Sequence, residues 1–265
     1  MQPTAASVLR DLIDEQAALD AVVADLSDEH WHMPTASERW SVADQIAHLA
    51  YFDESASWAI SDPDRFTASL TGLAPIFEPD AAPDTMDQLT LTAFREMSSG
   101  TLLDTWRRNR QTLADASAGL ADDDRVIWYG PSMGAKSFLT ARLMECWAHG
   151  QHVVDALGAD RAATDRLRHI AQLGVITRKW SYLNRGLDVP ELDVQVSLTA
   201  PSGDVWTFGD KSEQSITGSA EDFCLVVTQC RHVDATALGV VGADARDWML
   251  KAQAFAGGAT DGPAA

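Results

Sequence analysis

The sequence has 265 residues, of which 46% are hydrophobic, and 39 acidic against 20 basic residues give a formal net charge of −19. This excess of acid argues against a nucleic-acid partner, because phosphate binding needs clustered Lys and Arg. No run approaches the ~18 consecutive apolar residues of a membrane-spanning helix, and the N-terminus carries charges where a secretory signal needs an apolar run. We therefore expect a cytoplasmic protein with no membrane partner and a core large enough for two domains.

The first two-thirds of the chain has apolar residues at helical spacing. One of the segments begins with Ser41, followed three residues later by Asp44, which is the arrangement of a capping box. We expect helices at residues 4–26, 41–60, 84–120 and 137–158, a fifth at 161–182, and loops at 62–64, 75–83 and 126–136. Four helices with one polar site between them describe a bundle.

After Gly186 the pattern changes to the alternation of half-buried strands. We expect strands at 192–198 and 205–208 around a turn at 201–204, a third strand leading into a helix within 215–230, and a last helix at 242–256. The fold class is therefore mainly α. The expected divisions are a bundle at 1–160, a connecting helix at 161–185, a small α+β domain at 186–256 and a disordered tail at 257–265.

One helix carries a group of polar residues that suggests a site. Glu145, His149 and His152 stand at i, i+4 and i+7, so they share one face. Such a face can be a solvated stripe, a buried hydrogen-bonding network or half of a metal site. His48, in the middle of an apolar helical segment, could supply a ligand from a second element. Three N/O ligands that leave a position open are typical of a catalytic zinc site.

Structural interpretations of the same residues remain open. A lone His such as His48 is more often a hydrogen-bonded core or surface residue than a ligand. A Glu and a His four residues apart, as at Glu145 and His149, occur often by chance and stabilise a helix slightly. The spacing alone does not decide between these interpretations and a metal site.

Two segments resemble a known family. WSVADQIAHLA and ARLMECWAHGQHVVDALG are similar to the DinB-like superfamily, and within it to the mycothiol-dependent maleylpyruvate isomerase branch of actinobacteria. The resemblance implies an N-terminal four-helix bundle that holds a divalent metal, usually Zn²⁺, through His48, Glu145 and His149. It also implies a smaller C-terminal α+β domain related to sterol-carrier-like folds. The sequence does not separate Zn²⁺ from Ni²⁺, Fe²⁺ or Mn²⁺.

Further segments resemble an uncharacterised actinobacterial subgroup of this family: WYGPSMGAKSFLTARLMECWAHG, LTAPSGDVWTFG and ITGSAEDFCLVVTQ. The family implies mycothiol as the cosubstrate. A thiol bound to a divalent cation is deprotonated and becomes a nucleophile. The implied activity is thiol transfer to a small electrophile or isomerisation through reversible thiol addition. The alternatives are a non-catalytic metal- and ligand-binding protein and a metal-dependent hydrolase. We expect a monomer or a homodimer whose partners are a small thiol and an electrophile.

Several further residues are candidates for contacts with the thiol. The candidate lining residues are Trp40, Trp128, Tyr129 and Trp147. Large aromatic residues at helical spacing are normally core residues, which is the structural alternative for each of them. The loop at 126–136 mixes aromatic residues with Gly and Pro and is the candidate mouth of the site. Arg142 could orient the Glu145 carboxylate or form a surface ion pair.

His152 stands where the subgroup usually has Asp. It could be a fourth metal ligand, a donor to the substrate or a base, and we expect it to line the cavity with a catalytic role. In the family, an arginine of the C-terminal domain is implied in binding a substrate carboxylate. Arg231 could take that role here, although its local sequence does not match closely.

Overall fold

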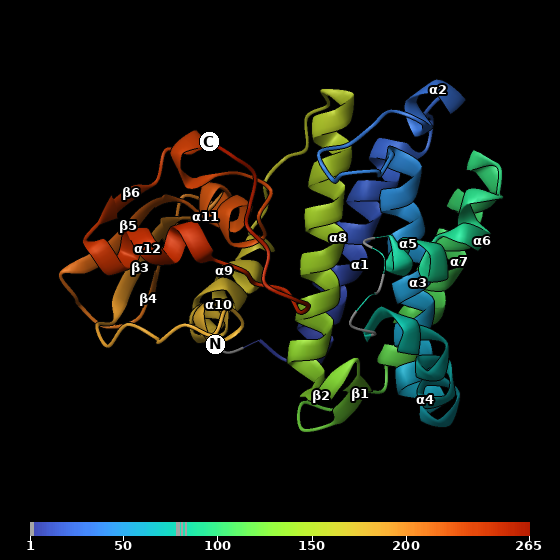
Figure 1. The fold of residues 1–265 in the computed structure, drawn as a ribbon, viewed down its shortest axis with the longest axis horizontal. Coiled ribbons are helices and arrows are strands. Elements are labelled where there is room, and N and C mark those ends of the chain that lie inside the picture. The colour runs from blue at the N-terminus through green and yellow to red at the C-terminus, as the bar shows by residue number, and fades with distance from the viewer. Residues whose placement is uncertain (1–2, 78–79, 81, 83) are drawn as a thin grey trace. The chain divides into compact units, whose positions relative to one another are not determined.

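The computed structural model describes residues 3–77, 80, 82 and 84–265, and the chain divides into two compact units, Met1–Arg161 and Ala162–Ala265. The first unit is built on four long helices that lie side by side (Figure 1). These are α1 (Ala5–Val23), α3 (Val42–Ser61), α7 (Ser99–Ser117) and α8 (Ala135–Leu157). Its shorter elements are α2 (Asp28–Trp31), α4 (Pro63–Leu70), η1 (Thr71–Phe77), α5 (Thr85–Thr90), α6 (Thr92–Arg95), β1 (Arg125–Trp128) and β2 (Gly130–Gly134). The mainly helical fold class with a bundle is as predicted.

Local capping explains where the bundle helices begin and end. α1 and α3 each begin with a capping box, in which the side chain of Thr4 or Ser41 and that of the residue three positions later bond each other's backbone N–H. α8 ends at Gly158, whose φ of 59° is the left-handed conformation that favours glycine. The predicted helices at 4–26 and 41–60, and the end of the fourth at 158, are confirmed.

The prediction of one helix over 84–120 is wrong, because the segment forms α5, α6 and α7. The Ser98 hydroxyl accepts a hydrogen bond from the Thr101 backbone N–H and so starts a new helix at that point. The loop expected at 62–64 also begins a helix. The Asp62 side chain caps the Arg65 N–H, and Pro63 occupies the first turn, where its missing N–H costs nothing.

The segment 126–136, expected to be a loop, is a hairpin of β1 and β2 in which Val126 pairs with Met133. The predicted start of the following helix at Ser137 is two residues late, since α8 begins at Ala135, whose N–H bonds the Asp124 carbonyl. The segment expected to be the mouth of the site is therefore a paired hairpin and not an irregular loop. Of the loop expected at 75–83, residues 78, 79, 81 and 83 lie outside the described residues, and η1 occupies the part up to Phe77.

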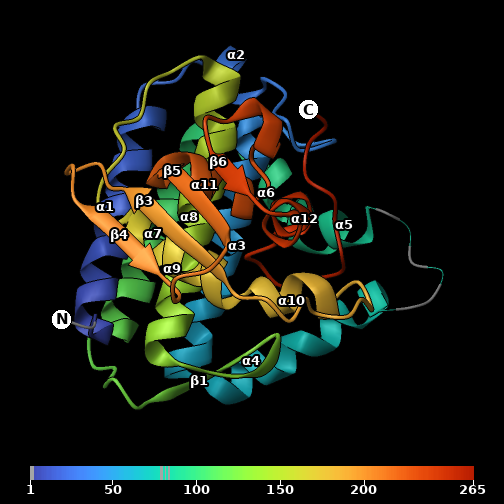
Figure 2. The same ribbon diagram turned by 90° about the vertical axis from the view of Figure 1, so that its left-hand side faces the viewer.

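The second unit contains a four-stranded mixed sheet in the order β4-β3-β5-β6, seen in Figure 2. The strands are β3 (Val194–Thr199), β4 (Val205–Phe208), β5 (Gln214–Ser219) and β6 (Gly239–Val241), and the helices are α9 (Leu167–Ile176), α10 (Arg178–Leu183), α11 (Ala220–Val227), η2 (Val233–Ala235) and α12 (Ala243–Lys251). β3 pairs antiparallel with β4 and parallel with β5. The two predicted strands, and the third strand leading into a helix, are confirmed.

Other expectations for this unit need correction. The helix expected over 161–182 begins only at Leu167 and is divided into α9 and α10 at Thr177, whose φ of −86° and ψ of 4° depart from α-helical values. The last helix is shorter than predicted, because the chain becomes extended at Ala252. In the tail expected to be disordered, the Thr260 hydroxyl donates to the Gln229 side chain. The division with a separate connecting helix stays a prediction.

Among the described residues, no helix combines the length and the apolar character needed to cross a membrane.

A buried polar network joins the four bundle helices, with one residue from each. Asp53 of α3 is 1% exposed, and its Oδ1 accepts a hydrogen bond of 2.9 Å from Arg142 of α8, which is 3% exposed. Its Oδ2 accepts bonds of 3.0 Å from Gln16 Nε2 of α1 and 3.3 Å from Trp106 Nε1 of α7. Because each partner comes from a different helix, this carboxylate specifies how the helices are arranged.

Replacing Arg142 with Met should lower the free energy of unfolding by about 3–5 kcal/mol, because it leaves the Asp53 carboxylate buried without its cation. Urea denaturation followed by circular dichroism measures the change. The exposed Arg108→Met on α7 is the matched control and should cost no more than about 0.5 kcal/mol. Equal costs for the two variants would mean that the Asp53–Arg142 pair does not hold the bundle together.

Candidate metal centre

Polar contacts join α3 to α8 at successive levels of the bundle. As the α3 partner moves forward along the chain, the α8 partner moves backward, so the helices run antiparallel. The contacts are Gln45 with His149, His48 with Glu145, and Asp53 with Arg142. The candidate ligands therefore lie on the same helix pair, and in the same register, as the buried ion pair.

His48, Glu145 and His149 meet at one carboxylate oxygen. Glu145 Oε2 lies 3.2 Å from His48 Nε2 and 3.1 Å from His149 Nε2. One ligand atom from each residue lies within 4.8 Å of the other two, and within the described part of the chain these three form the group able to hold a metal ion. Their side chains are 16%, 24% and 17% exposed, so a small molecule could reach the ligand atoms.

The environment sets the charges of these groups. Burial, together with the nearby His149 ring, lowers the pKa of His48 to about 4, so this imidazole is neutral at physiological pH. Burial alone would raise the pKa of Glu145, but its contacts with His149 and His48 outweigh burial and hold the pKa well below its ordinary value. The site thus presents a neutral imidazole and an ionised carboxylate, both of which are forms that ligate metal ions.

Aromatic rings surround the two imidazoles. The Trp40 ring centroid lies 5.2 Å from that of His48 and 5.8 Å from that of His149, with the latter pair stacked. The Phe52 ring lies 4.5 Å from His48. Rings at these distances limit the directions from which water can approach His48.

Trp128 and Tyr129, at the end of β1, lie beside the Phe52 ring, which in turn lies beside His48. Their ring centroids lie 6.4 Å and 5.5 Å from that of Phe52. Burial raises the pKa of the Tyr129 phenol, which therefore stays protonated at neutral pH and can donate a hydrogen bond. Both residues therefore lie one ring away from His48, with Phe52 between.

Two other predicted residues lie elsewhere. Trp147 is 4% exposed and packs under the guanidinium of Arg161, 5.2 Å from the ring centroid, on a different side of α8 from Glu145. Arg142 is buried and pairs with Asp53, which is neither the expected contact with Glu145 nor a surface ion pair. The helical rotation that brings Glu145 toward α3 directs Trp147 away from it.

His152 lies beside the site and outside the cluster of three. Its ring centroid is 6.4 Å from that of His149, with the rings inclined at 58°. It is half-buried. This position is one turn along α8 from the ligand atoms, where a side chain can face a bound molecule without contacting a cation.

Sequence reasoning missed Gln45 and Phe52. The Gln45 side-chain oxygen lies 2.6 Å from His149 Nδ1, and Gln45 is fully buried. The only available signal was its position three residues before His48, which places both on one face of α3. A neutral amide among apolar neighbours gives no further indication of a role.

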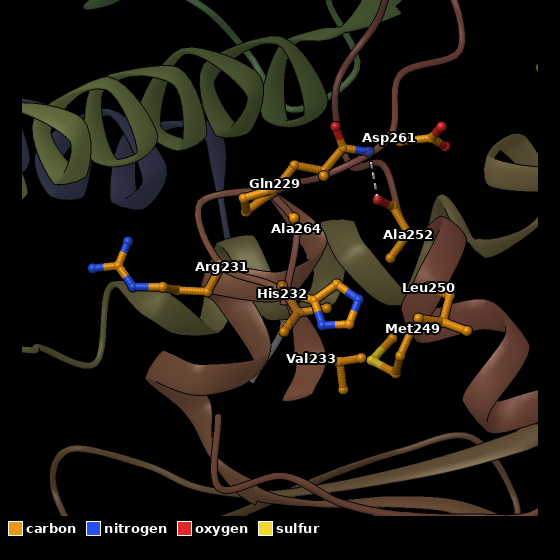
Figure 3. Close-up of a pocket in the computed structure, with 12 residues that line it drawn as sticks. Gln229, Arg231, His232, Val233, Met249, Leu250, Ala252, Asp261 and Ala264 are labelled. Atoms are coloured by element: carbon orange, nitrogen blue, oxygen red, sulfur yellow. Dashed lines mark hydrogen bonds between the residues drawn. The ribbon is translucent and has the colours of Figure 1, made fainter. Parts of the chain in front are cut away.

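Arg231 lies in the second unit, at the edge of a cavity of about 230 Å³ lined by Val233, Met249, Leu250 and the chain end (Figure 3). Its guanidinium donates to the Cys230 carbonyl and extends away from Met249 and Leu250. His232 points toward the apolar side of this cavity.

Comparison with known proteins decides the family. A family model described as the mycothiol maleylpyruvate isomerase N-terminal domain matches residues 12–153, which is more than half of the chain. The chain belongs to this mycothiol maleylpyruvate isomerase family. Two proteins of Mycobacterium tuberculosis, from strains CDC 1551 / Oshkosh and ATCC 25618 / H37Rv and both described as uncharacterized, are 42% identical to it over 248 residues, covering 93% of this chain and 94% of theirs.

Crystal structures show the same fold for a family member. The mycothiol-dependent maleylpyruvate isomerase matches with a TM-score of 0.54 at 18% identity, and a histidine-to-alanine mutant of it matches with a TM-score of 0.57 at 17% identity. Each comparison covers 90% of this chain and 92% of the other. The likeness therefore extends over both units, and at this identity it concerns the fold alone.

The low pKa of His48 should make the metal-free protein lose stability in acid. The unfolded chain takes up a proton near pH 6.5 and the folded protein only near pH 4, so the stabilising contribution is present above pH 6.5 and is lost as the pH falls from 6.5 to 4. With a chelator present, urea unfolding at pH 7 and pH 4.5 should show a loss in wild type that exceeds the loss in His48→Leu by about 2 kcal/mol. The same pH dependence in both proteins would contradict this.

Proposed function

We propose that this member of the mycothiol maleylpyruvate isomerase family is a metal-dependent enzyme that activates mycothiol for attack on a small electrophile. Thiol transfer and isomerisation share this first step. The observation that carries the proposal is the convergence of His48 Nε2, Glu145 Oε2 and His149 Nε2 from two helices at an accessible site. Mycothiol enters through the family, whose name includes this thiol.

The donor set fits a divalent cation. Two imidazole nitrogens and one carboxylate oxygen are ligands that Zn²⁺ accepts, and three protein ligands leave room for a fourth from the substrate. When bound, such a cation supplies Lewis acidity that makes a coordinated thiol far more acidic. We propose Zn²⁺, with Ni²⁺, Fe²⁺ and Mn²⁺ as candidates that the same donors accept.

The chain's own residues would then bind and orient the reactants. Trp40 and Phe52 exclude water from the faces of the imidazoles. Trp128 and Tyr129, whose rings lie near Phe52, form the adjoining wall for the thiol. His152 lies within reach of a bound molecule and can hold or give up a proton at its ring nitrogen. In an isomerisation, the thiolate adds to the unsaturated carbon, a bond rotates, and elimination returns the thiolate unchanged.

A purely structural metal would need a closed set of four protein ligands. Among the described residues the cluster contains three, and His152 lies outside it. This favours catalysis over a non-catalytic binding role. A hydrolase could use the same three ligands, so the test must follow the thiol itself.

The direct test is to incubate the zinc-loaded protein with mycothiol and a panel of electrophiles that includes maleylpyruvate, and to measure thiol consumption and isomer formation by mass spectrometry. Turnover with mycothiol, lost in His149→Ala, is the expected result. Hydrolysis of esters or amides at a rate independent of mycothiol would contradict the proposed use of the thiol.

His48→Ala and His149→Ala should each release the metal, because two remaining ligands bind a cation much more weakly than three. We expect less than about 0.1 equivalent of zinc after dialysis against a mild chelator, against one equivalent in wild type. Elemental analysis measures the content. His30→Ala, which changes an exposed histidine of the same unit, is the control and should keep full occupancy. Full occupancy in the two ligand variants would refute the assignment.

His152→Ala should keep its metal and lose activity. A group that transfers a proton during turnover contributes about 100-fold or more to the rate, so kcat/KM for mycothiol should fall by at least that factor while zinc content stays near one equivalent. Loss of zinc in this variant would instead make His152 a ligand, and unchanged kinetics would remove it from the site.

A further inference from the structure

The buried amide of Gln45 has an orientation that its neighbours determine. Thr35 has a single hydroxyl proton, which it donates to the Trp40 carbonyl at 2.9 Å. Its oxygen can therefore only accept from Gln45, at 2.8 Å, so the group facing Thr35 is the amide nitrogen. The same nitrogen donates to the Ser37 hydroxyl at 3.0 Å. The amide oxygen of Gln45 consequently faces His149.

This orientation determines the proton on one nitrogen of His149. Gln45 Oε1 lies 2.6 Å from His149 Nδ1 and can only accept, so Nδ1 must carry a proton. The other nitrogen, Nε2, is the atom directed at Glu145 and His48. When a cation lies between His149 Nε2 and Glu145 Oε2, the Nδ1 proton held by Gln45 leaves the Nε2 lone pair for that cation.

We propose that Gln45 is the positioning residue of the metal centre: it holds the proton on His149 Nδ1 and so directs Nε2 to the cation. This inference rests on the proposed function, because it concerns the same site. Gln45 is fully buried and acts through His149. Second-layer partners of this kind set the tautomer and the ring orientation of a histidine ligand.

The same contacts fasten a loop over the site. The Thr35 N–H also bonds the Trp40 carbonyl, at 2.9 Å, and the Ser41 and Pro34 backbones pair. Trp40, which stacks on His149, is therefore carried by a segment anchored to Gln45 through Thr35 and Ser37. Gln45 thus orients the ligand ring and supports the aromatic residue that packs against it.

The test compares zinc affinity, by competition with a chelator, in the full-length protein and three variants. Gln45→Leu removes the acceptor and should raise the Kd for zinc about 10- to 100-fold. Gln45→Glu restores an acceptor for His149 when the Thr35 and Ser37 hydroxyls turn to donate to its second oxygen. Its Kd should stay within about threefold of wild type, since carboxylates commonly hold the second nitrogen of a ligand histidine. The matched control is Gln253→Leu, which removes a buried amide of the second unit and should leave the Kd unchanged.

A second readout separates positioning from general destabilisation. In zinc-loaded wild type, the His149 Nδ1 proton should give a downfield NMR signal protected from exchange with water, and the signal should be lost in Gln45→Leu. Thermal unfolding of all variants shows how much stability each change costs. If Gln45→Leu does not fold, Thr35→Val removes the hydroxyl that orients the amide and should raise the Kd at least about threefold.

The outcomes distinguish the two proposals. If wild type binds zinc and the Kd of Gln45→Leu lies within twofold of the wild-type value, or if Gln253→Leu raises the Kd equally, the role of Gln45 is overturned and the metal centre stands. Absence of zinc binding by wild type overturns both.

Discussion

The buried ion pair between Asp53 and Arg142 sets the register on which the site depends. Both side chains lie almost wholly out of solvent, and the same carboxylate also holds Gln16 and Trp106 from the other two bundle helices. A slip of one residue between α3 and α8 would rotate the facing side chains by about 100° and shift them by about 1.5 Å. His48 would then no longer meet Glu145, so the structural pair and the ligand cluster depend on the same helix alignment.

Burying the carboxylates of Asp53 and Glu145 costs desolvation free energy, and their hydrogen-bonding partners offset this cost to different degrees. Burial raises the pKa of Asp53 even though Arg142 opposes the rise, so desolvation outweighs the attraction of the pair. At the ligand cluster, the two histidines lower the pKa of Glu145 more than burial raises it. The first arrangement gives a specific packing, and the second keeps an ionised carboxylate in a partly buried site. Holding that carboxylate ready for a cation is consistent with a functional role for the cluster.

The sequence predicts those parts that local patterns determine. The capping boxes at Thr4 and Ser41 and the glycine at Gly158 mark helix ends by their own hydrogen bonds and backbone conformation, and the structure has them there. The resemblance to the family directs attention to His48, Glu145 and His149, which the fold brings together. The sequence does not predict the break before α7, because a serine is also common inside helices. Only the structure shows that the Ser98 hydroxyl accepts a hydrogen bond from the Thr101 N–H.

The remaining parts depend on contacts distant in sequence. Arg142 is three residues before Glu145, which suggested a contact along the helix, but its partner comes from α3. Gln45 carries no charge and no motif that would indicate a site, and its role follows only from the direction of its amide. Trp147 was a plausible wall residue by composition, yet the helical rotation places it under Arg161. Such assignments need the packing of several helices at once.

Cobalt substitution tests the central claim most directly, because Co²⁺ in a zinc site reports both its ligands and any added thiol by visible absorption. Addition of mycothiol to the cobalt protein should produce an intense sulfur-to-cobalt charge-transfer band with saturable dependence on thiol concentration. The same titration of His149→Ala should give no such band. A cobalt spectrum that mycothiol leaves unchanged would contradict the account.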